Sequence, residues 1–421
     1  MNRVRYSPFL CFQHHSNNIA FLKFQEKTAL FLLVKIHSII VVKKGADYML
    51  IAYNNQQQLF LPYQYTRKAL QRYRRQMKFF CPQCLEQVQL KIGNYNIPHF
   101  AHFTKNQCSQ LFAEGESTLH LQGKIQLYEW LKKHGHQVKL EPYLKELSQR
   151  PDLLVTIDEE QFAVEFQCSS ISHEKWRQRT MGYERNDIQA IWLFQTPQSK
   201  ESTNGIRKIR ISPLLQKAFI TTITGLPYLL TYNAGTAQFI YWTNLLHVHG
   251  HTFIGKVQKI PIDQQHFPFY IPQRITQEEF QRYWQLYKQS CRQFAYNRLL
   301  HSKKGAQDPF LRNCYELNLS LTAMPPYIGI PVREGASISL FTSEWQTMLV
   351  YFSKQLGRQP FELTKGQMEN FLSQHQLEVT EQAVRAIQNY GHLLKRMNHE
   401  GGLLDNCEQV YVHLFAIATI Y

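Results

Sequence analysis

The chain has 421 residues and a formal net charge of +16 at pH 7, from 47 lysines and arginines against 31 acidic residues. This length exceeds one small module and leaves room for two or three domains. The excess of positive charge favours a polyanionic partner, nucleic acid ahead of a membrane surface. Charged residues make up 19% of the chain and aromatic residues 13%, which indicates a globular protein.

The cysteines and the apolar segment near the N-terminus indicate in which cellular compartment the protein works. Eight cysteines are spread unevenly, and two of them form a Cys-x-x-Cys pair, which favours a reducing cytosol and a bound metal over disulfides. The apolar segment 29–42 is interrupted by Lys35 and His37 and is too short to span a membrane. Lys43 and Lys44 follow it where a signal peptide would have small residues. We expect a cytoplasmic protein with no disulfide and no membrane span.

Residues 1–48 share no pattern with the rest of the chain, whereas regular patterning starts at Met49. We therefore expect 1–48 to be a non-native extension, with translation beginning at Met49. The alternative is an additional hydrophobic strand of the fold. A peptide from 1–48, found by mass spectrometry of the natural protein, would refute the first interpretation.

The segment 66–78 holds six basic residues, no acidic residue and one tyrosine. On a helix, such a stripe can lie along a phosphate backbone. The alternative is a basic face that is merely solvated. Because the segment directly precedes a metal motif, we favour contact with DNA.

That motif combines Cys81 and Cys84 with His99 and His102 after fourteen intervening residues. Two thiolates and two imidazoles suit the tetrahedral coordination of a structural zinc ion. The residues between them read as a strand and a turn, so zinc would stabilise a knuckle with a hairpin. Cys108 is a second candidate for one ligand position. Alternatively, the cysteines are reduced core residues.

The segment 150–169 predicts a β-hairpin, with apolar runs at 153–157 and 162–164 joined by four polar residues. Asp152 precedes the first strand, and Glu165 ends the second, followed by Gln167. Because side chains alternate along a strand, Glu165 and Gln167 project from one face. Antiparallel pairing brings Asp152 to the same place.

Carboxylates this close together repel each other unless a divalent cation lies between them, and oxygen ligands suit Mg²⁺ or Mn²⁺. Such an ion polarises a phosphoryl oxygen and activates a bound water for attack on a phosphodiester. The alternative is a surface hairpin with solvated acids. Against it, Glu165 lies within an apolar run, where an unpaired carboxylate is costly.

A helical stretch precedes this hairpin. Glu116, His120 and Lys124 recur every four residues along it, so they share one helix face. Glu116 could instead be a first-turn acid that favours the helix dipole. Glu141, on the strand that follows, is a further acidic candidate.

Pro151-Asp152 followed by Glu165-Phe166-Gln167 resembles the PD-(D/E)xK nuclease superfamily, and so does the expected element order α-β-β-β-α-β. More closely, residues 49–350 resemble the competence protein CoiA family, whose members act in DNA uptake and recombination in naturally transformable bacteria. The resemblance implies an α/β (α+β) fold with a PD-(D/E)xK nuclease-like core, an N-terminal zinc knuckle and a mainly helical C-terminal region.

The resemblance also implies roles for single residues. Asp152, Glu165 and Glu116 would bind the Mg²⁺ or Mn²⁺ ion. Gln167 occupies the usual position of a lysine; it cannot carry charge, but it can orient the attacking water. Arg179, on the helix after the hairpin, would hold the scissile phosphate.

We expect five regions. They are an N-terminal extension (1–48), a zinc-binding domain (49–112), a nuclease-like domain (113–212), a small β region (213–275) and a helical region (276–421). Capping boxes at Thr276 and Thr364 predict helix starts in the last region, which we assign to partner or DNA binding.

The predicted function is that of a Mg²⁺-dependent, endonuclease-like protein that processes DNA during transformation or recombination. Its expected partners are single-stranded or branched DNA and recombination proteins. The alternative keeps the fold without the chemistry: an accessory factor that loads or protects single-stranded DNA for a recombinase. An RNA-processing or defence nuclease would differ only in its substrate.

Overall fold

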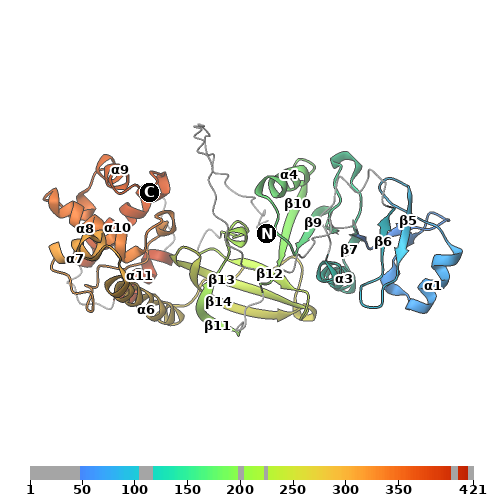
Figure 1. Cartoon of the computed structure of the whole chain (residues 1–421), viewed down its shortest axis with the longest axis horizontal. Helices are drawn as coiled ribbons and strands as arrows, with labels where there is room; N and C mark the ends of the chain where they lie inside the picture. The colour runs from blue at the N-terminus through green and yellow to red at the C-terminus, as the bar shows by residue number, and fades with distance from the viewer. Residues whose placement is uncertain (1–47, 104–116, 198–202, 222–225, 400–405, 416–421) are drawn as a thin grey trace, which may run out of the picture. The chain divides into compact units, whose positions relative to one another are not determined.

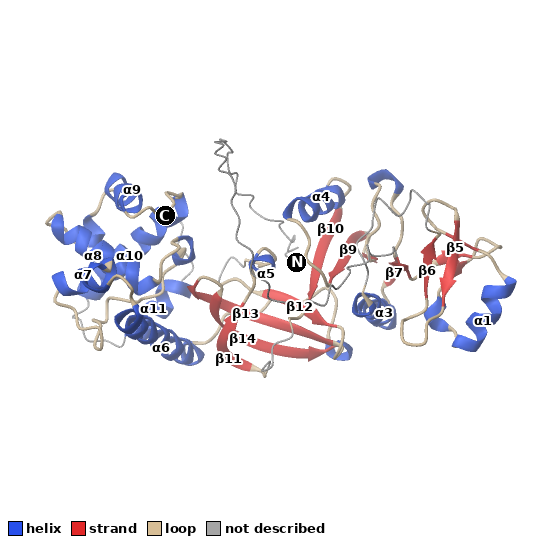
Figure 2. Cartoon of the chain, in the orientation of Figure 1, coloured by secondary structure: helices blue, strands red, loops and turns tan. Residues whose placement is uncertain are grey.

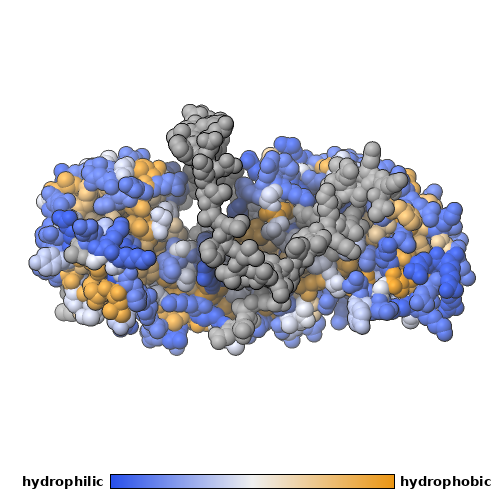
Figure 3. Space-filling model, in the orientation of Figure 1, coloured by the Kyte–Doolittle hydropathy of each residue, from blue (hydrophilic) through white to orange (hydrophobic). Residues whose placement is uncertain are grey.

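The computed structural model of the chain describes residues 48–103, 117–197, 203–221, 226–399 and 406–415. The proposed extension 1–48 therefore lies outside the described residues except for Tyr48. Within the described ranges, every helix is too short or too polar to cross a membrane. The surface in view is mostly hydrophilic, with hydrophobic residues in scattered patches (Figure 3).

The N-terminal part forms a six-stranded sheet in the order β1-β6-β5-β4-β2-β3 (Figure 1). Its strands are β1 (Tyr48–Met49), β2 (Ala52–Tyr53), β3 (Leu59–Phe60), β4 (Phe79–Phe80), β5 (Gln87–Lys91) and β6 (His99–His102). The helix α1 (Arg67–Gln76) begins at the N-cap Thr66 and buries Leu70 against this sheet's core. Phe60, Phe79 and Phe100 are the aromatic centre of that core.

The second sheet has eight strands in the order β11-β14-β13-β12-β10-β9-β8-β7 (Figure 2). They are β7 (Gln137–Leu140), β8 (Leu153–Ile157), β9 (Glu160–Gln167), β10 (Ile188–Gln195), β11 (Gly205–Arg210), β12 (Leu229–Asn233), β13 (Gln238–His249) and β14 (Thr252–Pro261). Strand β10 runs parallel to β9 and β12, and the other neighbours are antiparallel. The expected small β region is thus a continuation of the sheet that carries the predicted hairpin.

Two helices position the candidate site on this sheet. Helix α3 (Thr118–Lys133) packs its Leu127 and Trp130 into the core that contains Phe166, whereas α4 (His173–Glu184) buries Tyr183 among a separate group of sheet residues. Neighbouring residues of β8 and β9 enter different cores because side chains alternate along a strand. The order α3-β7-β8-β9-α4-β10 confirms the mixed α/β fold class with a nuclease-like core.

The C-terminal part is helical. Its helices are α6 (Gln277–His301), α7 (Pro309–Glu316), α8 (Thr342–Gln355), α9 (Lys365–Gln374), α10 (Glu381–His399) and α11 (Asn406–Phe415), and α5 (Pro213–Gln216) is a short helix before β12. Both predicted capping boxes are formed, one between Thr276 and Glu279 and one between Thr364 and Gln367. The core of these helices also includes Leu246, Val248 and Ile254 of the sheet.

Short 3₁₀ helices complete the described elements. They are η1 (Pro62–Gln64), η2 (Lys145–Leu147), η3 (Ile262–Gln264), η4 (Gly305–Gln307), η5 (Gly335–Ser337) and η6 (Pro360–Glu362). Most of them join longer elements over the surface, as short connections usually do.

Candidate functional site

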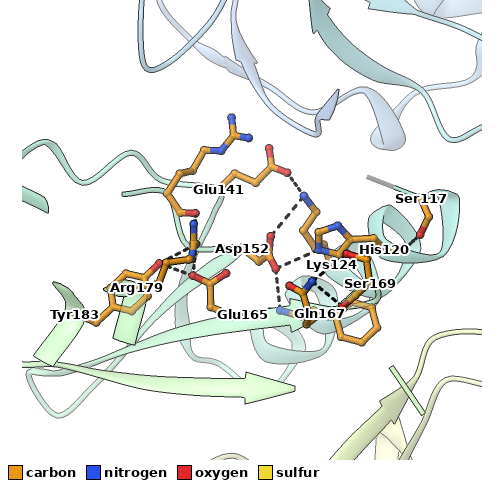
Figure 4. A network of polar contacts seen from close by, with 12 residues as sticks. Ser117, His120, Lys124, Glu141, Asp152, Glu165, Gln167, Ser169, Arg179 and Tyr183 are labelled. Atoms are coloured by element: carbon orange, nitrogen blue, oxygen red, sulfur yellow. Dashed lines mark hydrogen bonds and ion pairs between the residues drawn. The ribbon is translucent and has the colours of Figure 1, made fainter. Parts of the chain in front are cut away.

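The hairpin of β8 and β9 places two acidic residues opposite each other. Leu153 pairs with Val164, so the next position of the ladder sets Asp152 beside Glu165. Residues directly opposite in an antiparallel pair project from the same face of the sheet with their Cβ atoms close together. Asp152 lies between the side chains of α3 on one side and Glu165 on the other (Figure 4).

Asp152 is held by groups from two elements. Its Oδ2 accepts a hydrogen bond from the backbone N–H of Phe166 at 2.8 Å and lies 3.2 Å from Nε2 of His120, and its Oδ1 lies 3.6 Å from Nζ of Lys124. Burial alone would raise the pKa of Asp152, but the charges of His120 and Lys124 together with these hydrogen bonds hold it well below its usual range. Asp152 is therefore ionised at neutral pH.

Lys124 also pairs with a third carboxylate. Its Nζ donates to Oε1 of Glu141, and both side chains are only 1% exposed. The other oxygen of Glu141 accepts the backbone N–H of Leu50 at 2.9 Å. A buried ion pair of this kind is tolerated only when further hydrogen bonds satisfy its polar atoms. Lys124 thus connects Asp152 to a buried polar network.

Glu165 is bound by two groups of α4. Arg179 and Tyr183 both donate to its Oε1, and Arg179 also donates to the backbone carbonyl of Arg150 at 3.0 Å (Figure 4). Burial raises the pKa of Glu165, Asp152 adds to this effect, and Arg179 opposes it. The guanidinium therefore acts as an internal counter-ion for this carboxylate.

Gln167 lies two residues along the same strand, on the face that carries Glu165. Its Nε2 donates to the backbone oxygen and to Oγ of Ser169, both at 3.0 Å. These bonds fix the orientation of the amide beside the two carboxylates. Its predicted role in orienting a water remains a prediction.

The chemistry of these donors fits a hard divalent cation. Mg²⁺ is usually held by one or two carboxylates, with water and substrate phosphate as its other ligands. Both bonds to Glu165 go to Oε1, so Oε2 can serve as a ligand together with Oδ1 of Asp152. Glu116, the expected third carboxylate, lies outside the described residues.

Arg179 and Lys124 both have carboxylate partners that the sequence did not indicate. We expected Arg179 to hold the scissile phosphate and Lys124 to share a helix face with Glu116 and His120; in the structure Arg179 pairs with Glu165, and Lys124 is buried between Glu141 and Asp152. The four-residue spacing from His120 to Lys124 does indicate a shared helix face. The spacing does not indicate that Lys124 pairs with Glu141, which follows the strand β7.

A second group of ligands lies in the N-terminal sheet. Cys81, Cys84 and His102 place one ligand atom each within 4.8 Å of the others, and Sγ of Cys84 lies 3.4 Å from Nε2 of His102. The cysteines sit in the turn between β4 and β5, where Leu85 donates its N–H to the Cys81 carbonyl at 3.0 Å. Two sulfurs from a tight turn and an imidazole from the strand β6 fit zinc.

Burial raises the pKa of the Cys81 thiol, and the nearby Cys84 raises it further. A cation at this group would favour the thiolate instead, because a coordinating thiol loses its proton. The chemistry of the donors therefore fits a bound metal better than a pair of inert core thiols.

His99 is not part of this group, which corrects the expected set of four ligands. The strand β6 contains both histidines, and a spacing of three along a strand directs two side chains to opposite faces. His99 is 5% exposed, its Nδ1 contacts the carbonyl of Ile97 at 2.7 Å, and its ring packs on Tyr48. Cys108, the second candidate, lies outside the described residues.

The basic segment forms the predicted helix α1. Its six cationic side chains are exposed, and among the ion pairs of the described residues none involves them. The six are Arg67, Lys68, Arg72, Arg74, Arg75 and Lys78. They make α1 and the residues directly after it a strongly positive segment.

These features together define a nuclease-like α/β protein: a hairpin with paired carboxylates, flanked by α3 and α4, that follows in the chain a smaller sheet with a Cys/Cys/His group. The comparisons with known families agree. Residues 116–274 match the nuclease-like domain of competence protein CoiA, 62–111 match its N-terminal domain, and 283–409 match its C-terminal domain. The chain belongs to the competence protein CoiA family.

A similar protein supports this assignment. The chain is 27% identical over 282 residues to competence protein CoiA of Bacillus subtilis (strain 168). The aligned part covers 66% of this chain and 73% of the relative. The similarity therefore extends well beyond the nuclease-like domain.

Proposed function

We propose that this protein hydrolyses phosphodiester bonds of DNA with Mg²⁺ or Mn²⁺, and that it processes DNA in the cytoplasm during natural transformation. The observation that carries the proposal is the pairing of Asp152 with Glu165 on neighbouring strands, enclosed by Lys124 and Arg179. The family supports a role in competence. Cys81, Cys84, Cys291 and Cys314 are free thiols, which suits a reducing compartment.

A divalent ion bound by Asp152 and Glu165 would polarise a phosphoryl oxygen and lower the pKa of a bound water. The protein's own groups prepare its ligands. His120 and Lys124 keep Asp152 ionised, and Arg179 with Tyr183 fixes Oε1 of Glu165 so that Oε2 keeps one direction. Preorganised ligands of this kind lose little entropy when a substrate binds.

Lys124 supplies the positive charge that Gln167 lacks. A lysine is usual at the position of Gln167 in this type of site, and a neutral amide cannot stabilise a developing negative charge. Nζ of Lys124 reaches the same carboxylate pair from α3, 3.6 Å from Oδ1 of Asp152. Gln167, fixed by Ser169, is left to orient the attacking water.

The N-terminal domain would bind the DNA. The exposed cations of α1 can contact phosphates without regard to sequence, and a zinc ion at Cys81, Cys84 and His102 would hold the small sheet in shape. We expect single-stranded or branched DNA as the substrate and recombination proteins as partners.

The test is a cleavage assay on single-stranded, duplex and branched DNA with Mg²⁺ or Mn²⁺. Asp152→Asn should lose at least about 100-fold in rate, the usual scale for loss of a group that stabilises the transition state. Asp158→Asn is the matched control, because it removes the same charge at the exposed far end of the same hairpin. Equal rates for both variants would refute the proposed site.

The second candidate is a non-catalytic DNA-binding factor that loads or protects single strands for a recombinase. One observation favours it: Arg179 and Lys124 already neutralise the carboxylates, as in a structural ion-pair network. If the wild-type protein binds DNA but cuts none of the three substrates with either metal, this candidate replaces the nuclease.

A further inference from the structure

A cavity of about 870 Å³ lies where the eight-stranded sheet meets the C-terminal helices. Its walls come from β11, from the turn between β13 and β14, from α6 and from the start of α8. Helix α6 packs on β11 and β14 (Figure 1), and one hydrophobic core joins these strands to the helices. The walls therefore belong to one folded unit, and the volume is typical of a ligand site.

Positive charge dominates the lining. Two carboxylates are present, but Asp308 and Glu344 both pair with Arg298, the former at 2.8 Å. Lys208, Lys303 and Lys304 remain exposed, and in the described parts of the chain no ion pair involves them. Burial, followed by the charges of Lys208 and Arg210, lowers the pKa of His249 in the same wall.

Hydrogen bonds fix the segment of the cavity wall that precedes α7. Asp308 caps α7 by accepting the N–H groups of Phe310 and Leu311, and it also accepts the hydroxyl of Ser302 at 2.6 Å. These bonds fix the turn from which Lys303 and Lys304 project. The two lysines therefore face the cavity from a preorganised segment.

Flat aromatic groups form another part of the wall. The ring centroids of Phe294 and Phe341 are 4.3 Å apart, with an angle of 8° between the ring planes. The ring centroid of His249 lies 5.3 Å from that of Phe341. Gln293 and Asn297 of α6 add amide groups beside them. Lysines together with aromatic rings and amides are the groups that bind unpaired nucleotides.

We propose that this cavity is a second nucleic-acid site, which binds a segment of single-stranded DNA with its phosphates on Lys208, Lys303 and Lys304 and its bases along the wall that contains Phe294 and the amides of Gln293 and Asn297. An unpaired strand is favoured over a duplex because the wall offers an aromatic ring and amide groups, and only unpaired bases present their faces and edges to such groups. The proposal shares its ligand class with the proposed function, but it does not require cleavage, and none of its residues belongs to the carboxylate site.

The experiment measures binding by fluorescence anisotropy in EDTA, with a labelled oligothymidylate of about 12 nucleotides, within the usual site size of single-strand binders. The cavity variant combines Lys208→Glu, Lys303→Glu and Lys304→Glu. The control variant combines Lys217→Glu, Lys354→Glu and Lys395→Glu, three exposed lysines outside the cavity lining. Both variants change the net charge equally, so non-specific attraction falls by the same amount.

We expect the cavity variant to weaken binding at least about 10-fold more than the control, and to reduce the salt slope by about 2 for three lost phosphate contacts. Equal weakening by both variants would overturn the proposal. So would competition by duplex DNA, or by ATP alone, as effective as that by the single strand. If the Glu variant melts early, the corresponding triple Gln variant gives the same comparison.

Because EDTA prevents metal-dependent cleavage, the two proposals fail separately. A wild-type protein that never cuts DNA but shows the lysine-dependent binding refutes only the nuclease. Normal cleavage together with equal binding by both triple variants refutes only the cavity site.

Discussion

The two candidate metal sites of this protein differ in how their charges are balanced. Cys81, Cys84 and His102 belong to one small sheet and its turn, and they bring two thiols and an imidazole together. Asp152, Glu165 and Glu141 come from three strand ends and are already matched by Lys124 and Arg179. We expect the first group to depend on a bound ion for its stability, whereas the carboxylates of the second already have internal counter-ions.

From this difference we expect a structural role for the first site and a catalytic role for the second. A site that folds only around its ion is a structural site, because the binding free energy of the metal is part of the folding free energy. A site whose carboxylates are preorganised by internal cations can bind and release a metal with its substrate. The predictions below test this contrast, from the largest expected effect to the smallest.

Cys84→Ser should remove the zinc and unfold the N-terminal sheet, because a structural zinc contributes about 10 kcal/mol to a small domain. Metal analysis should fall from about one zinc per chain to none, and amide exchange should accelerate in β4, β5 and β6. Cys291→Ser, a free cysteine outside this group, is the control and should keep its zinc. Full zinc content in Cys84→Ser would contradict a structural zinc site at Cys81, Cys84 and His102.

Lys124→Met should cost about 3–5 kcal/mol of unfolding free energy, since it leaves two buried carboxylates without their cation. Urea unfolding gives the value. Lys133→Met, on the exposed part of the same helix, should stay within about 0.5 kcal/mol of wild type. The double variant Lys124→Met/Glu141→Gln should recover much of the lost unfolding free energy. If Lys124→Met alone is as stable as Lys133→Met, Lys124 does not balance the buried carboxylates.

Gly123→Ala should cost about 1–3 kcal/mol, because overpacking forces α3 away from the sheet. A Cβ at this position would lie 2.1 Å from Cε1 of Phe166. Gly366→Ala in α9 meets no atom within 4 Å and should be neutral or stabilising. Thermal unfolding measures both, and a loss of DNA cleavage in Gly123→Ala would show that the position of α3 sets the site geometry.

Asp152 should give the protein a specific sensitivity to acid. Its folded-state pKa lies below the unfolded value of about 4, so its stabilising effect is complete above that pH and is lost as the pH falls further. The stability difference between wild type and Asp152→Asn should shrink by about 1.4 kcal/mol per pH unit below about pH 4. Urea titrations between pH 3 and 7 measure it, and a difference that stays constant below about pH 4 would contradict the stabilisation of ionised Asp152.

Much of this arrangement follows from local sequence patterns. The hairpin from Leu153 to Gln167, the basic helix α1 and the capping boxes at Thr276 and Thr364 are present as expected, because alternation and capping act over a few residues. The opposition of Asp152 and Glu165 follows from the hairpin alone.

Features that depend on distant partners could not be derived. The spacing of His99 and His102 resembles a zinc pair, but it fails once the segment is a strand, because strand geometry sends the two side chains to opposite faces. Lys124 meets Glu141 only after β7 and α3 pack together. The basic cavity combines Lys208 with residues of α6 that are far from it in sequence.

The long strands β13 and β14 have a practical consequence for dividing the chain. Leu246, Val248 and Ile254 contribute to the same core as the C-terminal helices, although they precede residue 274, where the match to the nuclease-like domain ends. A fragment truncated there would present these apolar side chains to water and would be prone to aggregation. For expression and crystallisation, the sheet and the helices should therefore be kept on one polypeptide.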